Sequence, residues 1–283
     1  MLQQFPRTEV AGISMPRMIM GSNWVLGFSH TGVAADNYIK QINYNREAIA
    51  AIAERFLAQG VDAAMAPMCD NSCFPDGLKL AEDRLGKKII KVDTPILNVD
   101  DNAAARHSAE VEIKKSAAAG ATFCLIHHSS AEQLVNKNLR AMPRLPDYLS
   151  MIRDAGMIPG LSAHMPELIL YPDANEYDVQ TYIQIYNCMG FMMQVEIEGV
   201  HRIIENAKHP VMTIKSMAAG RCTPFVGLSF SYATLRPCDM VTVGAFTPDE
   251  VHEDVEIALA AIERRHPNLS ARNSPAVTSI IKG

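Results

Sequence analysis

The strongest constraint on the fold of this chain is a repeated alternation of short apolar segments with longer amphipathic ones. Eight apolar segments are predicted strands, and they end near Gly21, Met68, Val92, His127, His164, Asn187, Lys215 and Gly244. Parallel strands require crossover connections, usually helices, so this alternation predicts parallel pairing. Eight such units favour an α/β fold of the closed (β/α)8 TIM-barrel type, with eight parallel strands, over an open doubly wound sheet.

The amphipathic segments have the apolar spacing of helices. Helices are predicted over residues 46–59, 78–85, 103–119, 145–154, 166–171, 194–208 and 247–265. The last begins at Thr247-Pro248, an N-cap followed by proline at the first helical position. No linker or low-complexity segment divides the chain. A single TIM-barrel domain is therefore predicted over residues 1–283, with a short irregular tail from about residue 267.

Composition argues against several classes of function. The net charge of -5 at pH 7 offers no basic surface for nucleic acid or an anionic membrane. No apolar run approaches the roughly 20 residues that span a bilayer, and the N-terminus lacks a signal-peptide pattern. The six cysteines are scattered, which is typical of reduced thiols in a cytoplasm. A cytoplasmic protein with a small-molecule substrate is expected, and homo-oligomerisation stays open.

Polar side chains gather at the C-terminal ends of the predicted strands, where the active sites of such barrels lie. The candidate catalytic residues are Asp70, Asp93, His127, His128, His164 and Lys215. His127 and His128 are adjacent, so only one of them is expected to face the barrel axis if the strand stays extended. The segment 129–132, Ser-Ser-Ala-Glu, is interpreted as the cap of a following helix.

Lys215 closes the seventh predicted strand after an otherwise apolar run. Partial desolvation there would lower its pKa and suit it to general-base or Schiff-base chemistry. The alternative is a lysine that reaches the rim and binds an anion.

A second group of polar and aromatic residues is predicted to bind substrate. It comprises Asn23, Trp24, His30, Asn187 and Arg221. Trp24 is the only tryptophan of the chain, and an aromatic platform beside hydrogen-bonding groups suits a sugar-like ligand. Arg221 follows a loop of small residues that could hold a phosphate or a carboxylate.

Several segments resemble the aldo-keto reductase superfamily. Residues 20–27 are similar to the first strand and loop of that family, and 125–127 resemble the strand that carries its catalytic histidine, here His127. Residues 160–164, 186–187, 214–221 and 243–253 resemble its later strands and loops. The resemblance implies a (β/α)8 barrel and an NAD(P) cofactor.

The catalytic tetrad of that family is degenerate here. Its second strand ends in Asp-Thr-Ala and is followed by the Tyr that acts as general acid, whereas residues 60–67 offer neither. Lys91 lies near the place of the family's lysine, but Asp93 occupies the end of the strand. The resemblance therefore implies the barrel more strongly than the reduction reaction.

The leading hypothesis is a TIM-barrel enzyme that acts by acid–base chemistry on a small polar, including sugar-like, carbonyl or hydroxy compound. Metal assistance is the variant in which His128, His164 and Asp93 would hold a divalent ion. One alternative is an NAD(P)-dependent reductase of the aldo-keto type. Another is a barrel that binds a ligand without catalysis.

Overall fold

The computed structural model describes residues 5–69 and 72–269. Within them, eight parallel strands close into a barrel in the order β10-β3-β4-β5-β6-β7-β8-β9. The strands are β3 (Met18–Gly21), β4 (Ala63–Ala66), β5 (Ile90–Asp93), β6 (Phe123–Ile126), β7 (Ile158–Ala163), β8 (Tyr182–Ile185), β9 (Val211–Ile214) and β10 (Met240–Val243). The predicted fold class is confirmed, and each expected strand end lies at or within two residues of an observed one.

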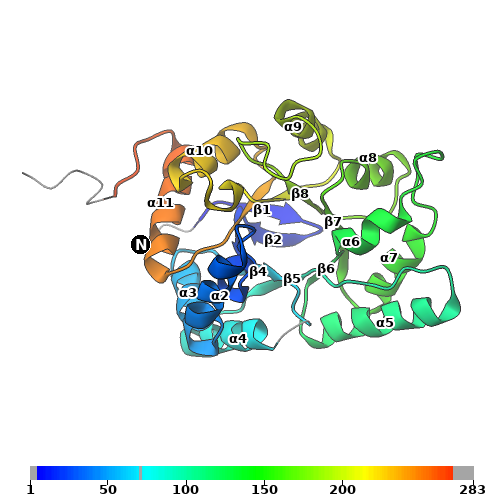
Figure 1. Ribbon diagram of the computed structural model, residues 1–283, viewed down its shortest axis with the longest axis horizontal. Coiled ribbons are helices and arrows are strands. Elements are labelled where there is room, and N and C mark those ends of the chain that lie inside the picture. The colour runs from blue at the N-terminus through cyan, green and yellow to red at the C-terminus, as the bar shows by residue number, and fades with distance from the viewer. Residues whose placement is uncertain (1–4, 70–71, 270–283) are drawn as a thin grey trace, which may run out of the picture.

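Helices surround the barrel, as Figure 1 shows. They are α1 (Asn23–Leu26), α2 (Val33–Asn43), α3 (Arg46–Ala58), α4 (Cys73–Leu85), α5 (Ala103–Ala118), α6 (His128–Ala131), α7 (Leu145–Asp154), α8 (Glu167–Ala174), α9 (Ile197–Asn206), α10 (Pro224–Thr234) and α11 (Pro248–Glu263). Two short 3-10 turns, η1 (Glu132–Leu134) and η2 (Ala218–Gly220), follow α6 and β9. No helix of the described ranges has the length and apolarity needed to cross a membrane.

Two of the longer helices, α2 and α10, have no counterpart among the predicted ones, and neither has the one-turn helix α1. On α2 the apolar side chains of Val33 and Tyr38 are 74% and 57% exposed, so no buried stripe signals the helix. On α10 the buried positions include Gly227, where a Cβ would lie 2.6 Å from the backbone oxygen of Ser216. A small residue is needed for that close approach, and it weakens the apolar period that marks helices in a sequence.

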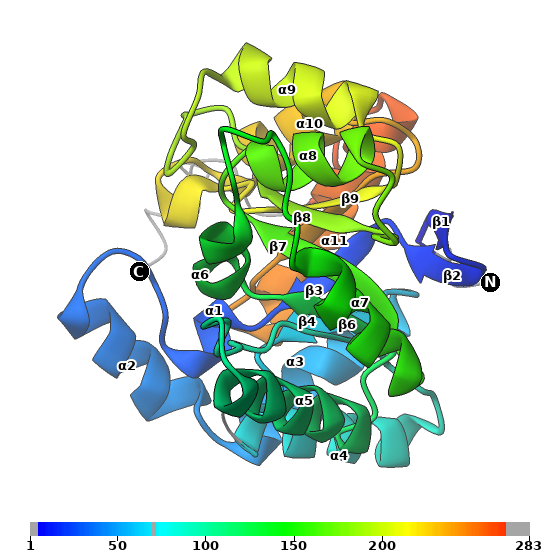
Figure 2. The same cartoon turned by 90° about the vertical axis from the view of Figure 1, so that its right-hand side faces the viewer.

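A β-hairpin closes the end of the barrel opposite the mouth. Its strands are β1 (Arg7–Val10) and β2 (Ile13–Pro16), joined by Ala11 and Gly12 at φ 50° and 81°. Two central residues with positive φ are typical of a type I′ hairpin turn. Residues 15–16 belong to this hairpin, so the first strand of the barrel begins only at Met18. Figure 2 shows the hairpin at one end of the molecule and α2 and α6 toward the other.

The barrel interior is filled by alternate residues of the strands. Its buried members are Val10, Met15, Ile19, Ala63, Met65, Val92, Phe123, Leu125, Ile183, Met212 and Met240. Val10 and Met15 come from the hairpin, so the apolar filling continues through the closed end. Only the C-terminal ends of the strands therefore remain for a polar cavity. The predicted tail from about residue 267 lies mostly outside the described residues.

Candidate active site

A cavity of about 890 Å³ opens at the C-terminal ends of the barrel strands. The predicted site residues that line it are Asn23, Trp24, His30, His127, His128, His164, Lys215 and Arg221. The loops after β3, β6, β7 and β9 supply them. This convergence follows from closure, because every parallel strand of a barrel delivers its C-terminal end to the same face.

Asp93 and Asn187 are fully buried and lie outside the cavity lining. The Asp93 carboxylate accepts hydrogen bonds from the backbone nitrogens of Met68 and Thr94, at 2.7 and 2.8 Å. Asn187 similarly accepts from the nitrogen of Phe191 at 2.9 Å and donates to its oxygen. Both side chains hold the backbone that follows a strand. Asp70, the remaining candidate, lies outside the described residues.

His127 and His128 both line the cavity, contrary to the expectation that only one faces the mouth. β6 ends at Ile126, so the alternation of an extended strand no longer applies to the two histidines. His127, at φ -57° and ψ 145°, is the N-cap of α6, and its Nδ1 accepts from the backbone nitrogen of Ser129. The helix cap therefore lies two residues earlier than expected.

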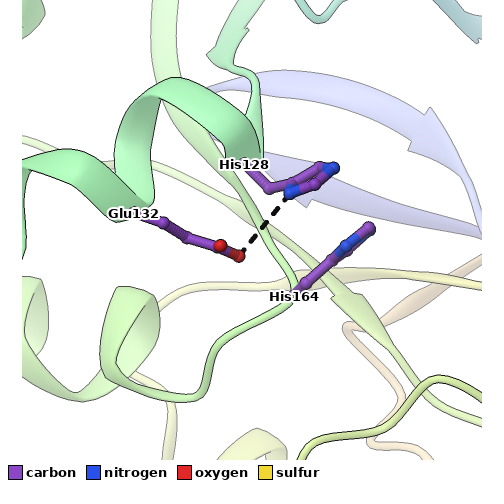
Figure 3. A group of neighbouring side chains, drawn as sticks. All are labelled: His128, Glu132 and His164. Atoms are coloured by element: carbon purple, nitrogen blue, oxygen red, sulfur yellow. Dashed lines mark ion pairs between the residues drawn. The ribbon is translucent and has the colours of Figure 1, made fainter. Parts of the chain in front are cut away.

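The imidazoles of His128 and His164 stack against each other, with ring centroids 3.7 Å apart and an angle of 21° between the planes. Glu132 lies beside them, with its Oε1 3.6 Å from Nδ1 of His128 (Figure 3). This carboxylate was missed as a site residue, because residues 129–132 were interpreted as a helix cap. The i,i+4 spacing of His128 and Glu132 was the available signal, since such residues share one face of a helix.

The histidines of the mouth are neutral at pH 7. Desolvation, reinforced by the Lys215 ammonium and neighbouring imidazoles, lowers the pKa of His164 to about 3. The same causes lower the pKa of His127 to about 4. Desolvation also lowers the pKa of His128, against the opposing attraction of Glu132. An imidazolium is disfavoured here because it would lose hydration beside an existing cation.

Lys215 is the residue directly after β9, and it has a positive φ of 63°. Burial lowers the pKa of its ammonium to about 8. Within the described ranges, no carboxylate oxygen lies within 4.0 Å of its Nζ as an ion-pair partner. Lys215 thus presents a partly desolvated cation to the cavity, and no described residue supplies its counter-charge. Charged groups in such a position are stabilised by a ligand of opposite charge.

One wall of the cavity joins the loops after β3 and β9. Nδ2 of Asn23 lies 3.3 Å from Nε2 of His30, and the Arg221 guanidinium donates to the backbone oxygen of His30 at 3.3 Å. The same guanidinium lies 3.9 Å above the ring of Phe191. Trp24 packs on the end of β10, where a Cβ on Gly244 would lie 2.8 Å from its ring. Polar donors and an aromatic face therefore border the same space.

Acidic residues of α11 also line the cavity and were missed as site residues. Glu250, Glu253 and Asp254 were interpreted only as part of the helix predicted over residues 247–265. Glu250 accepts a hydrogen bond from the backbone nitrogen of Phe246 at 2.6 Å, so it caps the helix as well. Their position near the mouth depends on how α11 packs, which helical spacing alone does not indicate.

The resemblance implies a tyrosine acid in the loop after the second strand of the barrel, which is β4. β4 ends at Ala66, the loop after it begins with Pro67, and no tyrosine lines the part of the cavity formed by residues 5–69 and 72–269. The tyrosine hydroxyl expected as proton donor for a reduced carbonyl is therefore not supplied from this position.

Purified protein is expected to show no turnover of a simple aromatic aldehyde with NADPH, because the described lining contains no tyrosine acid. The measurement is the loss of NADPH absorbance, with an active aldehyde reductase as positive control. Robust reduction would restore the reductase hypothesis.

No family model matches this chain, and no curated protein matches its sequence. Solved structures do match. A Pseudomonas aeruginosa protein provisionally described as an aldo-keto reductase superposes with a TM-score of 0.63 at 14% identity, over 93% of this chain and 98% of that one. Aldose reductase from Giardia lamblia gives a TM-score of 0.53 at 11% identity, over 95% of each chain.

A barrel of different activity is also similar. Type I 3-dehydroquinate dehydratase from Clostridium difficile gives a TM-score of 0.51 at 10% identity, over 89% of this chain and 97% of that one. At these identities, and with such different activities among the matches, the likeness concerns the fold alone. The chain has the (β/α)8 barrel architecture that these proteins share.

Proposed function

We propose that this protein is an enzyme that transfers a proton at the carbon next to a carbonyl group in a small polar compound. The observation that carries the proposal is the pairing of Lys215, a cation with no counter-charge among the described residues, with neutral imidazoles in one cavity. A carbonyl compound needs both functions when it loses an α-proton. Negative charge develops on its oxygen, and a base must take the proton.

In this proposal, Lys215 stabilises the developing enolate oxygen. Its ammonium lies in a partly desolvated position, where an electrostatic interaction is stronger than in water. The same burial is the physical reason for its lowered pKa. Negative charge on the substrate would supply a partner for the ammonium, so the interaction strengthens as the transition state forms.

The imidazoles act as proton carriers. A base must be unprotonated before it accepts a proton, and the lowered pKa values of His127 and His164 keep both rings neutral at pH 7. Histidine suits this role because it can accept at one ring nitrogen and donate from the other.

The remaining lining suits a small hydroxylated substrate. A volume of about 890 Å³ lies within the range of about 300–1,000 Å³ that is usual for small-molecule sites. Asn23, His30 and Arg221 offer hydrogen-bonding groups, and Trp24 offers an apolar face. Sugars and related hydroxy carbonyl compounds present both hydroxyl groups and apolar C–H faces, which matches this combination.

Exchange of α-protons for deuterium tests the proposal even when the product of the reaction is unidentified. Glycolaldehyde, dihydroxyacetone, short aldoses and ketoses, and 2-oxo acids would each be incubated with the protein in D2O and followed by proton NMR. Enzyme-dependent loss of an α-proton signal for at least one compound is expected. Exchange that is equally fast with the Lys215→Met variant would contradict the assigned role. The matched control is Lys208→Met, because Lys208 is a surface lysine that pairs with Glu176.

The exchange rate is expected to fall as pH rises through about 8. The protonated fraction of Lys215 declines around its pKa of about 8, and the ammonium is the form that stabilises the enolate. Below that pH the rate should stay level to about pH 5, because the imidazoles of His127 and His164 remain neutral. Initial exchange rates from pH 5 to 10 provide the measurement. A rate that instead increases through pH 8 would indicate a neutral amine that adds to the carbonyl.

A further inference from the structure

We propose that His128, Glu132 and His164 form a binding site for a divalent transition-metal ion, with zinc as the reference case. Each residue offers one ligand atom, and these atoms all lie within 4.8 Å of one another. Figure 3 shows the Glu132 carboxylate of η1 pointing toward the His128 ring of α6, with the ring of His164, the residue after β7, stacked beside His128. The inference goes beyond the proposed function; when the ion is bound, His164 is a ligand and His127 remains as the imidazole that carries the proton.

The separation of the ligand atoms suits a small ion. Zinc bonds to imidazole nitrogen and carboxylate oxygen are about 2.0–2.2 Å long, so two ligands of a tetrahedral ion lie roughly 3.4 Å apart. Nδ1 of His128 and Oε1 of Glu132 are 3.6 Å apart, already near that value. The ring of His164 is stacked on that of His128, with centroids 3.7 Å apart, and must turn out of this stack before its nitrogen can point at the same ion.

The Glu132 carboxylate gives an independent indication of a ligand. Its Oε1 is buried and has no hydrogen-bond partner among the described residues, and its 3.6 Å separation from His128 is too long for a hydrogen bond. Buried polar atoms are almost always paired in proteins, and an unpaired one suggests an ion or water that completes the site. A cation between this oxygen and the two imidazoles would satisfy it.

The position of the ligands in the fold also favours a defined site. His128 and Glu132 are four residues apart on consecutive helical turns, so their side chains share one face. His164 directly follows β7, and β7 pairs with β6, which ends two residues before His128. An ion would therefore link the segments that follow two neighbouring strands of the closed barrel.

The donor set narrows the choice of metal. Two imidazole nitrogens and one carboxylate suit zinc, cobalt or ferrous iron, whereas magnesium and calcium prefer oxygen ligands alone. Three protein ligands leave at least one coordination position open, as in catalytic zinc sites. His128 and His164 both line the cavity, so the open position would face the substrate. Glu132 thus replaces Asp93 in the ligand set that was predicted from the sequence. The Asp93 carboxylate accepts hydrogen bonds from backbone amides instead.

Metal titration of the full-length protein tests the inference. After chelator treatment and dialysis, calorimetry with ZnCl2 should detect one tight site per chain. Glu132→Gln keeps the size of the side chain but removes its charge, and it should weaken zinc binding by more than about 10²-fold. Loss of a residue that only orients a ligand already costs about 10- to 100-fold. His164→Ala should have a similar effect. The control is Glu167→Gln, which should bind zinc like the wild type. Glu167 is an acid of α8 that pairs with Lys137.

Cobalt substitution separates this site from the cysteines. Cys188 and Cys222 have sulfur atoms 3.9 Å apart and could bind zinc on their own. The visible spectrum of the Co2+ form should show nitrogen and oxygen ligation without a thiolate charge-transfer band, and Cys222→Ser should not change it. Wild-type protein without a tight site, or binding that survives Glu132→Gln but is lost in Cys222→Ser, would overturn the proposal. No substrate is used, so these results are independent of the exchange assay.

Discussion

Replacing Lys215 by methionine is expected to lower α-proton exchange by about 10²–10³-fold or more while the protein stays folded. Removal of one donor directed at a developing oxyanion typically has an effect of this size. Methionine retains much of the length of the side chain, and a partly buried cation with no counter-charge among the described residues contributes little to stability. Initial exchange rates report on the chemistry, and thermal melting reports on the fold.

His164→Ala is expected to have a comparable effect on exchange, because its imidazole lies in the same cavity and stacks on His128. The matched control is His107→Ala, which should retain the wild-type exchange rate because His107 is an exposed histidine of α5. If Lys215→Met kept near-full exchange, the lysine would be a cation of the rim and the mechanism would lose its electrophile. If only His164→Ala were inactive, the imidazoles alone would carry the reaction.

Asp239→Ala is expected to lower the free energy of unfolding by about 3–5 kcal/mol, the usual result of removing one partner of a buried ion pair. Asp239 is fully buried and accepts from Nε and Nη2 of Arg236 at 2.9 and 2.7 Å. It also accepts from the backbone nitrogen of Val211 at 2.9 Å, where β9 begins. The variant would leave both the guanidinium and a buried amide without this acceptor.

Urea unfolding followed by circular dichroism measures this change. Glu110→Gln is the control, because Glu110 pairs with Lys114 at the surface of α5 at 2.7 Å. Such i,i+4 pairs contribute only about 0.2–0.5 kcal/mol. A loss below about 1 kcal/mol for Asp239→Ala would mean that water or another side chain replaces the carboxylate. The strand that carries Lys215 would then not depend on this ion pair for its position.

Much of the fold could be predicted from the sequence, because strands and helices leave local periods in it. The helix at Leu145–Asp154 was predicted with its observed bounds, since apolar residues recur on one face and a glycine follows. α2 and α10 were missed for the opposite reason. The first exposes most of its large apolar residues and buries only Ile39 among them, and the second uses Gly227 to approach the backbone of a neighbouring segment. A period cannot mark a helix that buries no apolar stripe.

The candidate site was predicted to the extent that it follows from strand ends. Closure of a parallel barrel brings those ends to one face, so His127, His164 and Lys215 could be placed together from sequence order alone. Trp24 and Arg221 were placed in the same way, on loops that follow strands of the barrel. The lowered pKa values of His127, His164 and Lys215 required the structure, because desolvation depends on neighbours that are distant in the chain.

What the sequence determined by itself is the barrel and the face on which its polar groups meet, because both follow from the order and spacing of residues. Tertiary structure alone decided how each polar group is used. Asp93 turns to the backbone amides of Met68 and Thr94, because buried amides require acceptors. Glu132 reaches the imidazoles of His128 and His164, because β6 ends one residue before His127 and a helical turn begins there. Such local changes of direction depend on packing between strands, which no period in the sequence records.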